Sequence, residues 1–215
     1  MSPRVRSLKL HKLKHSFFER PALELARDLV GTILVRRFRG REFRARIFET
    51  EAYVGPHDLA CHASRGRTRR TEVMFGPAGH AYVYFIYGMY DMFNIVASHV
   101  DDPQAVLIRG ATALDGWNAD LSGPGKLTRA MRITRAQNAL DLAGESLFLL
   151  GDPAWRPQIV TTKRIGIDYA GEWKDALLRF VDTGAVPSRS LRHEEPVSRP
   201  SSTANDGEFH PGKKA

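Results

Sequence analysis

The chain has very little cysteine and no long apolar run. Cys61 is its single cysteine among 215 residues, which excludes an internal disulfide or a zinc site built from several cysteines and is typical of a reducing cytosol. No stretch of about 18 apolar residues occurs, so the sequence predicts no membrane-spanning helix. Residues 1–15 lack the continuous apolar segment of a secretory signal, and none is expected.

Acidic residues are scarce in the first quarter of the chain only. Residues 1–50 hold 13 Lys and Arg against 5 Asp and Glu, a balance of +8, whereas residues 51–215 hold 19 of each. A second, local group of arginines consists of Arg65, Arg67, Arg69 and Arg70. Clustered cations favour a polyanionic partner, either nucleic acid or an acidic membrane surface. A basic surface that is merely solvated is the alternative.

The residue patterns predict an α+β domain. Near-helical spacing predicts helices over 22–29 and 126–133, and Glu19 three residues after Ser16 predicts an N-cap at Ser16. Alternation and β-branched or aromatic composition predict strands over 32–38, 43–51, 80–87, 92–97, 105–109, 147–150 and 158–162. Helical turns are expected over 58–63, 138–141 and 172–179. Because the connections are too short for crossovers, the fold class is a single compact domain around a curved antiparallel β-sheet with flanking helices.

The composition changes at both ends. Residues 1–15 are basic and unpatterned and are predicted to form a flexible arm. Residues 190–215 consist largely of Ser, Pro, Arg, Glu and Gly, which predicts a disordered tail. One domain over residues 16–189 remains between them, as the chain length suggests.

Two glutamates stand at the end of the predicted 43–51 strand. Glu49 and Glu51 are two residues apart and therefore share a face. Glu51 lies close to the turn at Gly55-Pro56, where functional groups are often displayed. A carboxylate among apolar and aromatic neighbours would have a raised pKa and could act as a general base. Two ordinary solvent-facing glutamates are the alternative.

The next segment contains four possible metal ligands, namely His57, Asp58, Cys61 and His62. All four residue types can bind zinc, but such closely spaced ligands do not easily close one tetrahedron, so no metal site is predicted. A hydrogen-bonding His62 is expected instead. Cys61 is expected to pack as a small hydrophobic residue, because no activating context for a nucleophile is evident.

Tyrosine is concentrated in one segment. Four of the six tyrosines lie within residues 82–90, with Tyr82 and Tyr84 alternating along one face and Tyr87 beside Gly88 at a bend. An aromatic core strand is one interpretation. Since a tyrosine hydroxyl needs a partner, platforms for stacking on bases are the other. A bulky side chain at a turn could also wedge into a duplex.

Two further positions carry charge at an informative place. Gly123-Pro124-Gly125-Lys126 lacks the P-loop pattern, yet its backbone amides and Lys126 at a helix start could hold one DNA phosphate. Arg109 ends an apolar strand, where an unpaired guanidinium would be costly. We therefore expect Arg109 to have a carboxylate partner.

Taken together, these motifs resemble the alkyladenine (3-methyladenine) DNA glycosylase family, the single-domain type found in mammals and many bacteria, from about residue 16 to 184. The matching motifs are Glu49-Thr-Glu-Ala-Tyr53, Tyr87-Gly-Met-Tyr90, Ser122-Gly-Pro-Gly-Lys126-Leu127, Arg164-Ile-Gly166 and Gly171-Glu-Trp173. The segment between Arg109 and Ser122, only 12 residues long, is shorter than is common in that family. His57 also replaces a residue that is often acidic there.

The resemblance implies a site for a nucleotide flipped out of duplex DNA. Glu51 would be the general base that activates water, and Arg109 would help to hold that water against C1′ of the sugar. Tyr53 and Tyr84 would enclose the flipped base, while His62 would hydrogen-bond to its edge.

The same resemblance implies residues around that site. Asn94 would form part of the pocket floor and guard against the 2-amino group of normal guanine. Tyr87 would take the place of the flipped base in the stack, with Met89 beside it. Arg65 and Lys126 would contact the DNA backbone.

The activity so implied is that of a monofunctional DNA glycosylase in base-excision repair. It would excise alkylated or deaminated purines, including 3-methyladenine, 7-methylguanine, ethenoadenine and hypoxanthine, from double-stranded DNA. No metal, organic cofactor or membrane is implied, and a monomer is expected, in the bacterial cytosol or nucleoid or, in a eukaryote, the nucleus. A non-catalytic DNA-binding protein and a carbohydrate or nucleoside hydrolase using Glu49 and Glu51 are the alternatives. The first would not need Glu51 and Arg109, and the second would not need the arginine loop or Tyr87.

Overall fold

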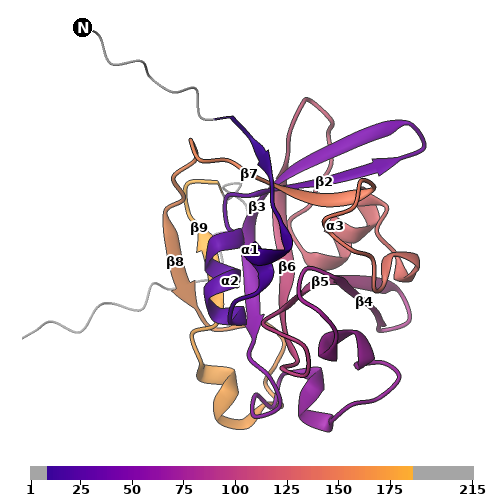
Figure 1. Ribbon diagram of the computed structural model, residues 1–215. Helices are drawn as coiled ribbons and strands as arrows, with labels where there is room; N and C mark the ends of the chain where they lie inside the picture. The colour runs from indigo at the N-terminus through magenta and orange to yellow at the C-terminus, as the bar shows by residue number, and fades with distance from the viewer. Residues whose placement is uncertain (1–8, 186–215) are drawn as a thin grey trace, which may run out of the picture.

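One antiparallel sheet carries the fold. The computed structural model describes residues 9–185, and within that range nine strands pair in the order β1-β7-β2-β3-β6-β5-β4, with β9 on β3 and β8 on β9 (Figure 1). Every strand pairing among them is antiparallel. The predicted α+β class is therefore confirmed. The predicted tail over 190–215 lies outside the described residues.

The elements are short and are joined mainly by turns. The strands are β1 (His11–Lys12), β2 (Ile33–Phe38), β3 (Arg41–Tyr53), β4 (Ala81–Ile86), β5 (Tyr90–Ala97), β6 (Gln104–Ala113), β7 (Leu147–Gly151), β8 (Ile159–Thr162) and β9 (Arg179–Asp182). The helices are α1 (His15–Phe18), α2 (Ala22–Leu29) and α3 (Pro124–Met131), with 3₁₀ helices η1 (His62–Arg65), η2 (Glu72–Phe75), η3 (Arg135–Gln137) and η4 (Gly171–Asp175). All seven predicted strands and both predicted longer helices are thus present; α2 has the predicted bounds, and the bounds of the other elements are shifted.

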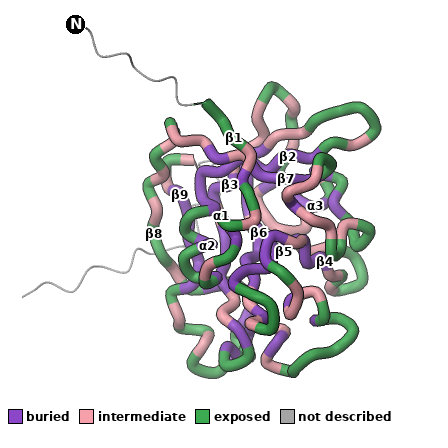
Figure 2. The backbone as a smooth tube through the Cα atoms, in the orientation of Figure 1, coloured by how far each residue is buried: buried purple, intermediate pink, exposed green. Residues whose placement is uncertain are grey.

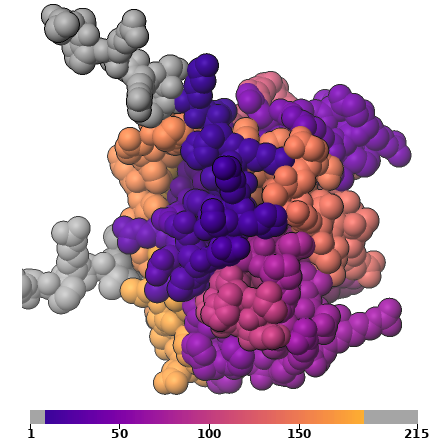
Figure 3. Space-filling model, viewed as in Figure 1, coloured from indigo at the N-terminus to yellow at the C-terminus, as the bar shows by residue number. Residues whose placement is uncertain are grey.

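Helix α2 matches its prediction because its pattern is strongly amphipathic. It buries Ala22, Leu25, Ala26 and Leu29. This apolar face packs against β3 and β6, so the helix covers one face of the sheet (Figures 1 and 3). The chain then turns at Gly31, whose φ of 91° favours glycine.

Three of the sequence predictions, for Ser16, for residues 1–15 and for residues 138–141, are wrong. Helix α1 begins at His15 behind an extended Lys14, so Ser16 is no N-cap. The predicted arm includes β1, which pairs with β7, and residues 1–8 lie outside the described range. Residues 138–141 form no helix, because Ala139 has a positive φ of 62° and its backbone N–H donates to the Ala81 carbonyl at 2.8 Å.

Strand β3 is longer than predicted and positions the candidate site. Its first half pairs with β2, its second half pairs with β9, and β6 runs along the other edge. The register against β6 shifts on both sides of Glu49, which marks a β-bulge of the kind often found beside active sites. Residue 51 therefore lies in the middle of the sheet.

The main core fills the space between the sheet and the helices that cover it. Buried side chains of α2, α3, β3, β5 and β6 form one cluster, and buried backbone follows the same strands in Figure 2. A second cluster combines Cys61, Met74 and Tyr82 with the partly buried Tyr53 and Tyr84. Among residues 9–185, no helix is long and apolar enough to cross a membrane.

Candidate active site

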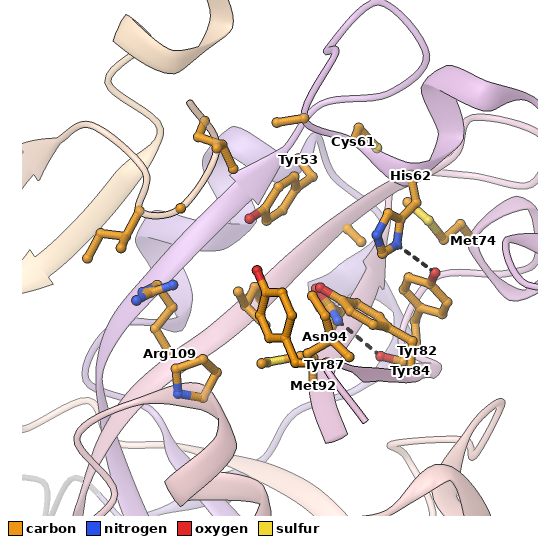
Figure 4. Close-up of a pocket in the computed structure, with 18 of the residues that line it drawn as sticks. Tyr53, Cys61, His62, Met74, Tyr82, Tyr84, Tyr87, Met92, Asn94 and Arg109 are labelled. Atoms are coloured by element: carbon orange, nitrogen blue, oxygen red, sulfur yellow. Dashed lines mark hydrogen bonds between the residues drawn. The ribbon is translucent and has the colours of Figure 1, made fainter. Parts of the chain in front are cut away.

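An aromatic pocket opens between β4, β5, β6, the end of β3 and the loop 164–170. Its cavity volume of about 260 Å³ lies just below the usual range for small-molecule sites, roughly 300–1,000 Å³. Figure 4 shows its aromatic rings around one space, with Arg109 at the side. Six of the ten predicted site residues line it, namely Tyr53, His62, Tyr84, Tyr87, Asn94 and Arg109.

Glu51 is fully buried and contacts three residues of the pocket wall. One carboxylate oxygen accepts the backbone N–H of Ile165 at 2.8 Å and lies 3.4 Å from Nε of Arg109. The other accepts the Tyr53 hydroxyl at 2.9 Å. Burial raises the pKa of Glu51 above its ordinary value, although Arg109 and the two hydrogen-bond donors oppose this rise. A carboxylate with a raised pKa is suited to accept a proton near neutral pH.

Glu49 shares Arg109 with Glu51. Its Oε1 accepts Nε–H of Arg109 at 3.0 Å and Nε–H of Arg179 at 2.8 Å. The prediction that both glutamates share a face and that Arg109 has a carboxylate partner is confirmed, and the solvent-facing alternative is wrong. Gly110 permits this packing, because a Cβ there would lie 2.6 Å from the Phe48 ring.

A buried ion pair joins the end of β3 to the loop that carries Ile165. Arg164 donates to both carboxylate oxygens of Asp58, at 2.5 and 2.8 Å, and both side chains are fully buried. The same guanidinium donates to the Ala52 carbonyl at 2.9 Å and lies 4.8 Å from the centre of the Tyr53 ring. Ile165, whose backbone N–H donates to Glu51, follows Arg164 directly in the chain. By binding Asp58 and Ala52, Arg164 thus keeps Ile165 close to β3, the strand that carries Glu51.

The histidine and two of the tyrosines form one packed group. His62 Nδ1 lies 2.9 Å from the Tyr82 hydroxyl, and its ring meets that of Tyr84 edge-on at 4.5 Å. Burial, with Arg70 and Arg65 adding to it, lowers the pKa of His62 to about 4. Burial raises the pKa of Tyr82 to about 12. His62 is therefore neutral and Tyr82 keeps its proton at neutral pH.

Tyr87 stands at the tip of the hairpin between β4 and β5. It is 76% exposed, and its neighbour Met89 is 61% exposed. Tyr87 and Gly88 both have positive φ, 54° and 68°, as the central residues of a type I′ turn do. Such a backbone is strained for tyrosine, and strain of this kind clusters at functional sites.

The remaining predicted residues lie around the pocket. Asn94 is buried and donates from Nδ2 to the Tyr82 carbonyl at 3.2 Å (Figure 4). Arg65 is exposed at the end of η1. Lys126 is exposed on α3 and forms an ion pair with Asp120 at 2.8 Å. A phosphate at Lys126 would therefore have to compete with a carboxylate.

The four possible metal ligands are separated by their contacts. Asp58 is bound by Arg164, and His62 by Tyr82. Cys61 is buried in the second cluster, as predicted, and burial raises the pKa of its thiol to about 11. In the part of the chain that the structure describes, no group of three or more His, Cys, Asp or Glu side chains is placed to hold a metal ion.

Sequence reasoning missed two residues of the site, Arg179 on β9 and Tyr169 at the rim. It also missed two roles, that of Glu49 as a bridge between arginines and that of Tyr82 as the partner of His62. A weak signal existed for Tyr169, one of six tyrosines, three residues after the Arg164-Ile-Gly166 motif. No local signal could place Arg179, because the strand that carries it pairs with β3 across 130 residues of chain.

Glu51 itself does not line the pocket but lies directly behind three residues that do, Tyr53, Arg109 and Ile165. A desolvated carboxylate behind an aromatic pocket, in contact with an arginine of its wall, suits hydrolysis of a bond next to a planar ring. The model of the methylpurine-DNA glycosylase family matches residues 16–186. The chain belongs to this family, whose members are hydrolytic DNA glycosylases of base-excision repair.

Individual relatives show the same relationship. The chain is similar to proteins named "Putative 3-methyladenine DNA glycosylase" in three organisms. It is 47% identical to that of Anaeromyxobacter sp. (strain Fw109-5), over 80% of this chain and 90% of the relative. It is 48% identical to that of Methanocella arvoryzae, over 79% of this chain and 92% of the relative. It is 48% identical to that of Myxococcus xanthus, over 75% of this chain and 84% of the relative.

Proposed function

We propose that this chain excises 3-methyladenine from double-stranded DNA, together with 7-methylguanine, ethenoadenine and hypoxanthine. The observation that carries the proposal is the position of Glu51, which is fully buried, has a raised pKa and touches three residues of an aromatic pocket. A damaged purine costs less to unstack than a normal one, because its pairing is poor or its ring is charged.

The proposed reaction is hydrolysis of the glycosidic bond. The bond between C1′ and the purine nitrogen breaks, and its electron pair leaves with the base. Water then bonds to C1′ while Glu51 takes the proton of that water. The carboxylate also stabilises the cation-like sugar in the transition state. Arg109, held by Glu49 and Glu51, has its guanidinium at the pocket wall, where it would position the water.

Recognition of the base is proposed to rest on Tyr53 and on the packed group of His62, Tyr82 and Tyr84. Tyr53 and Tyr84 both line the pocket and would contact the base. If the Tyr82 hydroxyl donates to Nδ1 of neutral His62, Nε2 carries the hydrogen and can donate to an acceptor on the edge of the base. Asn94 would exclude the 2-amino group of guanine.

Contacts with the duplex are proposed at the exposed rim. Tyr87 would fill the gap left by the flipped base, and Met89 would lie beside it. Arg65 would contact the backbone near the lesion, and Lys126 would do so after release from Asp120. We also propose that it acts as a monomer. A DNA substrate implies action in the bacterial cytosol or nucleoid or, in a eukaryote, the nucleus.

A duplex with one lesion tests the proposal. Oligonucleotides carrying hypoxanthine, ethenoadenine or a methylated purine are incubated with the protein and then treated with alkali, which cuts abasic sites. We expect cleavage after alkali and none before it, as for a monofunctional enzyme. Absence of cleavage with all three lesions would refute the proposal, and nicking without alkali would refute monofunctional action.

Two further assays separate this proposal from the two alternatives, a non-catalytic DNA-binding protein and a nucleoside hydrolase. A non-catalytic DNA-binding protein would retard the lesion duplex in a gel without releasing a base. A nucleoside hydrolase would release hypoxanthine from free inosine, which chromatography detects. We expect base release from the duplex only.

A further inference from the structure

A second hollow lies on the other side of the hairpin that carries Tyr87. Its volume is about 410 Å³, and it is lined by Met89 and Tyr90 of the hairpin, by Arg129 and Arg132 at the end of α3, and by Arg36 of β2. We call it the α3 groove. In Figure 1, α3 lies between the β2–β3 hairpin and the β4–β5 hairpin. The tip of the β4–β5 hairpin therefore borders both the aromatic pocket and the α3 groove.

The groove carries uncompensated positive charge. Within residues 9–185, no carboxylate lies within ion-pair distance of Arg129 or Arg132, and both side chains belong to exposed residues. The nearby Arg135 lies 3.8 Å from Asp91, the carboxylate that lines the groove. One partly buried acid thus faces several guanidinium groups.

Arg36 adds a buried cation to this charge. It is only 6% exposed and donates to the carbonyls of Arg37 and Ser146, but its Nε has no hydrogen-bond partner in the described structure. A buried guanidinium without a carboxylate is unfavourable unless an anion compensates it. Arg36 therefore adds a buried positive charge to the lining of the groove, where Asp91, whose Oδ1 also lacks a hydrogen-bond partner, is the carboxylate.

Arg132 occupies a position that its backbone disfavours. It ends α3 in the left-handed conformation, with φ of 54°, where glycine is the usual residue. A cation at a helix C-terminus does interact well with the helix dipole. That effect would be served equally by a lysine or arginine in the last helical turn, and Arg129 already stands there.

We propose that the α3 groove binds the phosphodiester backbone of one arm of the duplex, beyond the flipped nucleotide. The inference rests on the proposed function, because the hairpin tip places the lesion on one side and the groove on the other. Eight residues separate Pro124 at the pocket from Arg132, which is about 12 Å along a helix. At about 3.4 Å per nucleotide, the contacted phosphates lie about three or four steps from the lesion.

Charge removal in the groove, against matched removal elsewhere, tests the inference. The test variant is Arg129→Gln/Arg132→Gln. The control is Arg27→Gln/Arg156→Gln, which removes two exposed arginines, one on α2 and one between β7 and β8, that do not line the groove. Fluorescence anisotropy gives the Kd for an undamaged and a lesion duplex at several salt concentrations. Single-turnover excision is measured at saturating protein.

We expect the groove variant to lower the slope of log K against log salt by about one to two, since each lost phosphate contact removes about 0.9. Its Kd should rise about tenfold at low salt, while excision at saturation stays within about twofold of wild type. On a duplex with only two base pairs in the contacted arm, variant and wild type should bind equally. The control should keep the wild-type slope.

An unchanged slope in the groove variant, or an equal change in the control, would overturn the inference. So would a variant that keeps its duplex affinity but loses binding to vesicles with acidic lipids or to single-stranded RNA. If wild type excises no lesion, the proposed function fails. The salt slope on undamaged duplex still decides whether the groove holds DNA.

Discussion

The ion pairs around Glu51 and the arginines of the α3 groove use charge in opposite ways. Around Glu51, two carboxylates and two arginines, Arg109 and Arg179, are nearly excluded from water and tied to one another by short contacts. In the α3 groove, Arg129 and Arg132 reach solvent. Under the proposed function, the first arrangement would be pre-organised around the bond that reacts. The second would adapt to a DNA backbone of any sequence.

The difference decides what a substitution costs. A buried charge that loses its partner costs about 3–5 kcal/mol, whereas an exposed ion pair contributes about 0–1 kcal/mol. Substitutions near Glu51 should therefore affect excision or folding strongly. Substitutions at the rim should affect DNA binding and spare the chemistry.

The largest effect is expected for Glu51→Gln. The side chain keeps its size but cannot accept a proton, so single-turnover excision should fall by about 10²–10⁴. Glu24→Gln, which changes an exposed carboxylate of α2, is the control and should excise like wild type. Circular dichroism should show both variants folded. Full excision by Glu51→Gln would mean that another group is the base.

The Asp58–Arg164 pair tests whether the buried region acts beyond stability. Arg164→Met leaves Asp58 unpaired and should lose about 3–5 kcal/mol, measured by urea unfolding. The double variant Asp58→Leu/Arg164→Met removes both charges and should recover part of that stability, because the backbone N–H groups of Val54 and Ala60 lose their acceptor. We still expect it to excise about tenfold to a hundredfold more slowly, because the Ile165 N–H is no longer held on Glu51.

The pH profile separates a positioning role from a structural one. In the folded double variant, loss of the Ile165 hydrogen bond should raise the pKa of Glu51 further and move the acidic limb of the profile to higher pH. A double variant with wild-type rate and profile would show that the pair serves stability alone.

Tyr87→Ala tests the exposed rim. Loss of the ring should weaken binding to a lesion duplex by about 10- to 100-fold, since an aromatic stacked on a base contributes about 1–3 kcal/mol. The unfolding free energy should not fall, because the side chain is exposed and its backbone is strained. Tyr87→Phe is the control and should bind like wild type. An unchanged Kd for Tyr87→Ala would exclude the wedge.

The smallest effect is expected from pH itself. Glu51 must be deprotonated to accept a proton, and burial raises its pKa above the ordinary 4.5. Excision should therefore fall as the pH drops, and the midpoint of that fall should lie above the ordinary 4.5. His62, with a pKa of about 4, stays largely neutral down to that midpoint. A hypoxanthine substrate avoids titration of a charged lesion, and a flat profile down to pH 4.5 would contradict the assignment.

Local patterns predicted the elements that depend on neighbouring residues. Helix α2 has the predicted bounds because four apolar side chains recur at helical spacing. The shared face of Glu49 and Glu51 followed from strand geometry and survived the bulge. The predicted cap at Ser16 failed because α1 already begins at His15. The sequence also did not predict β1, which pairs with β7 about 140 positions away.

The sequence by itself determined the fold class, the family and the carboxylate and aromatic side chains of the site, because motifs and periodicity are local properties. The tertiary structure alone decided which charges meet. It paired Arg109 and Arg179 with Glu49, bound Asp58 with Arg164, left Lys126 engaged by Asp120 and gathered the arginines of the α3 groove. Ion pairs and burial depend on distances between strands and loops far apart in the chain, and those distances exist only after folding.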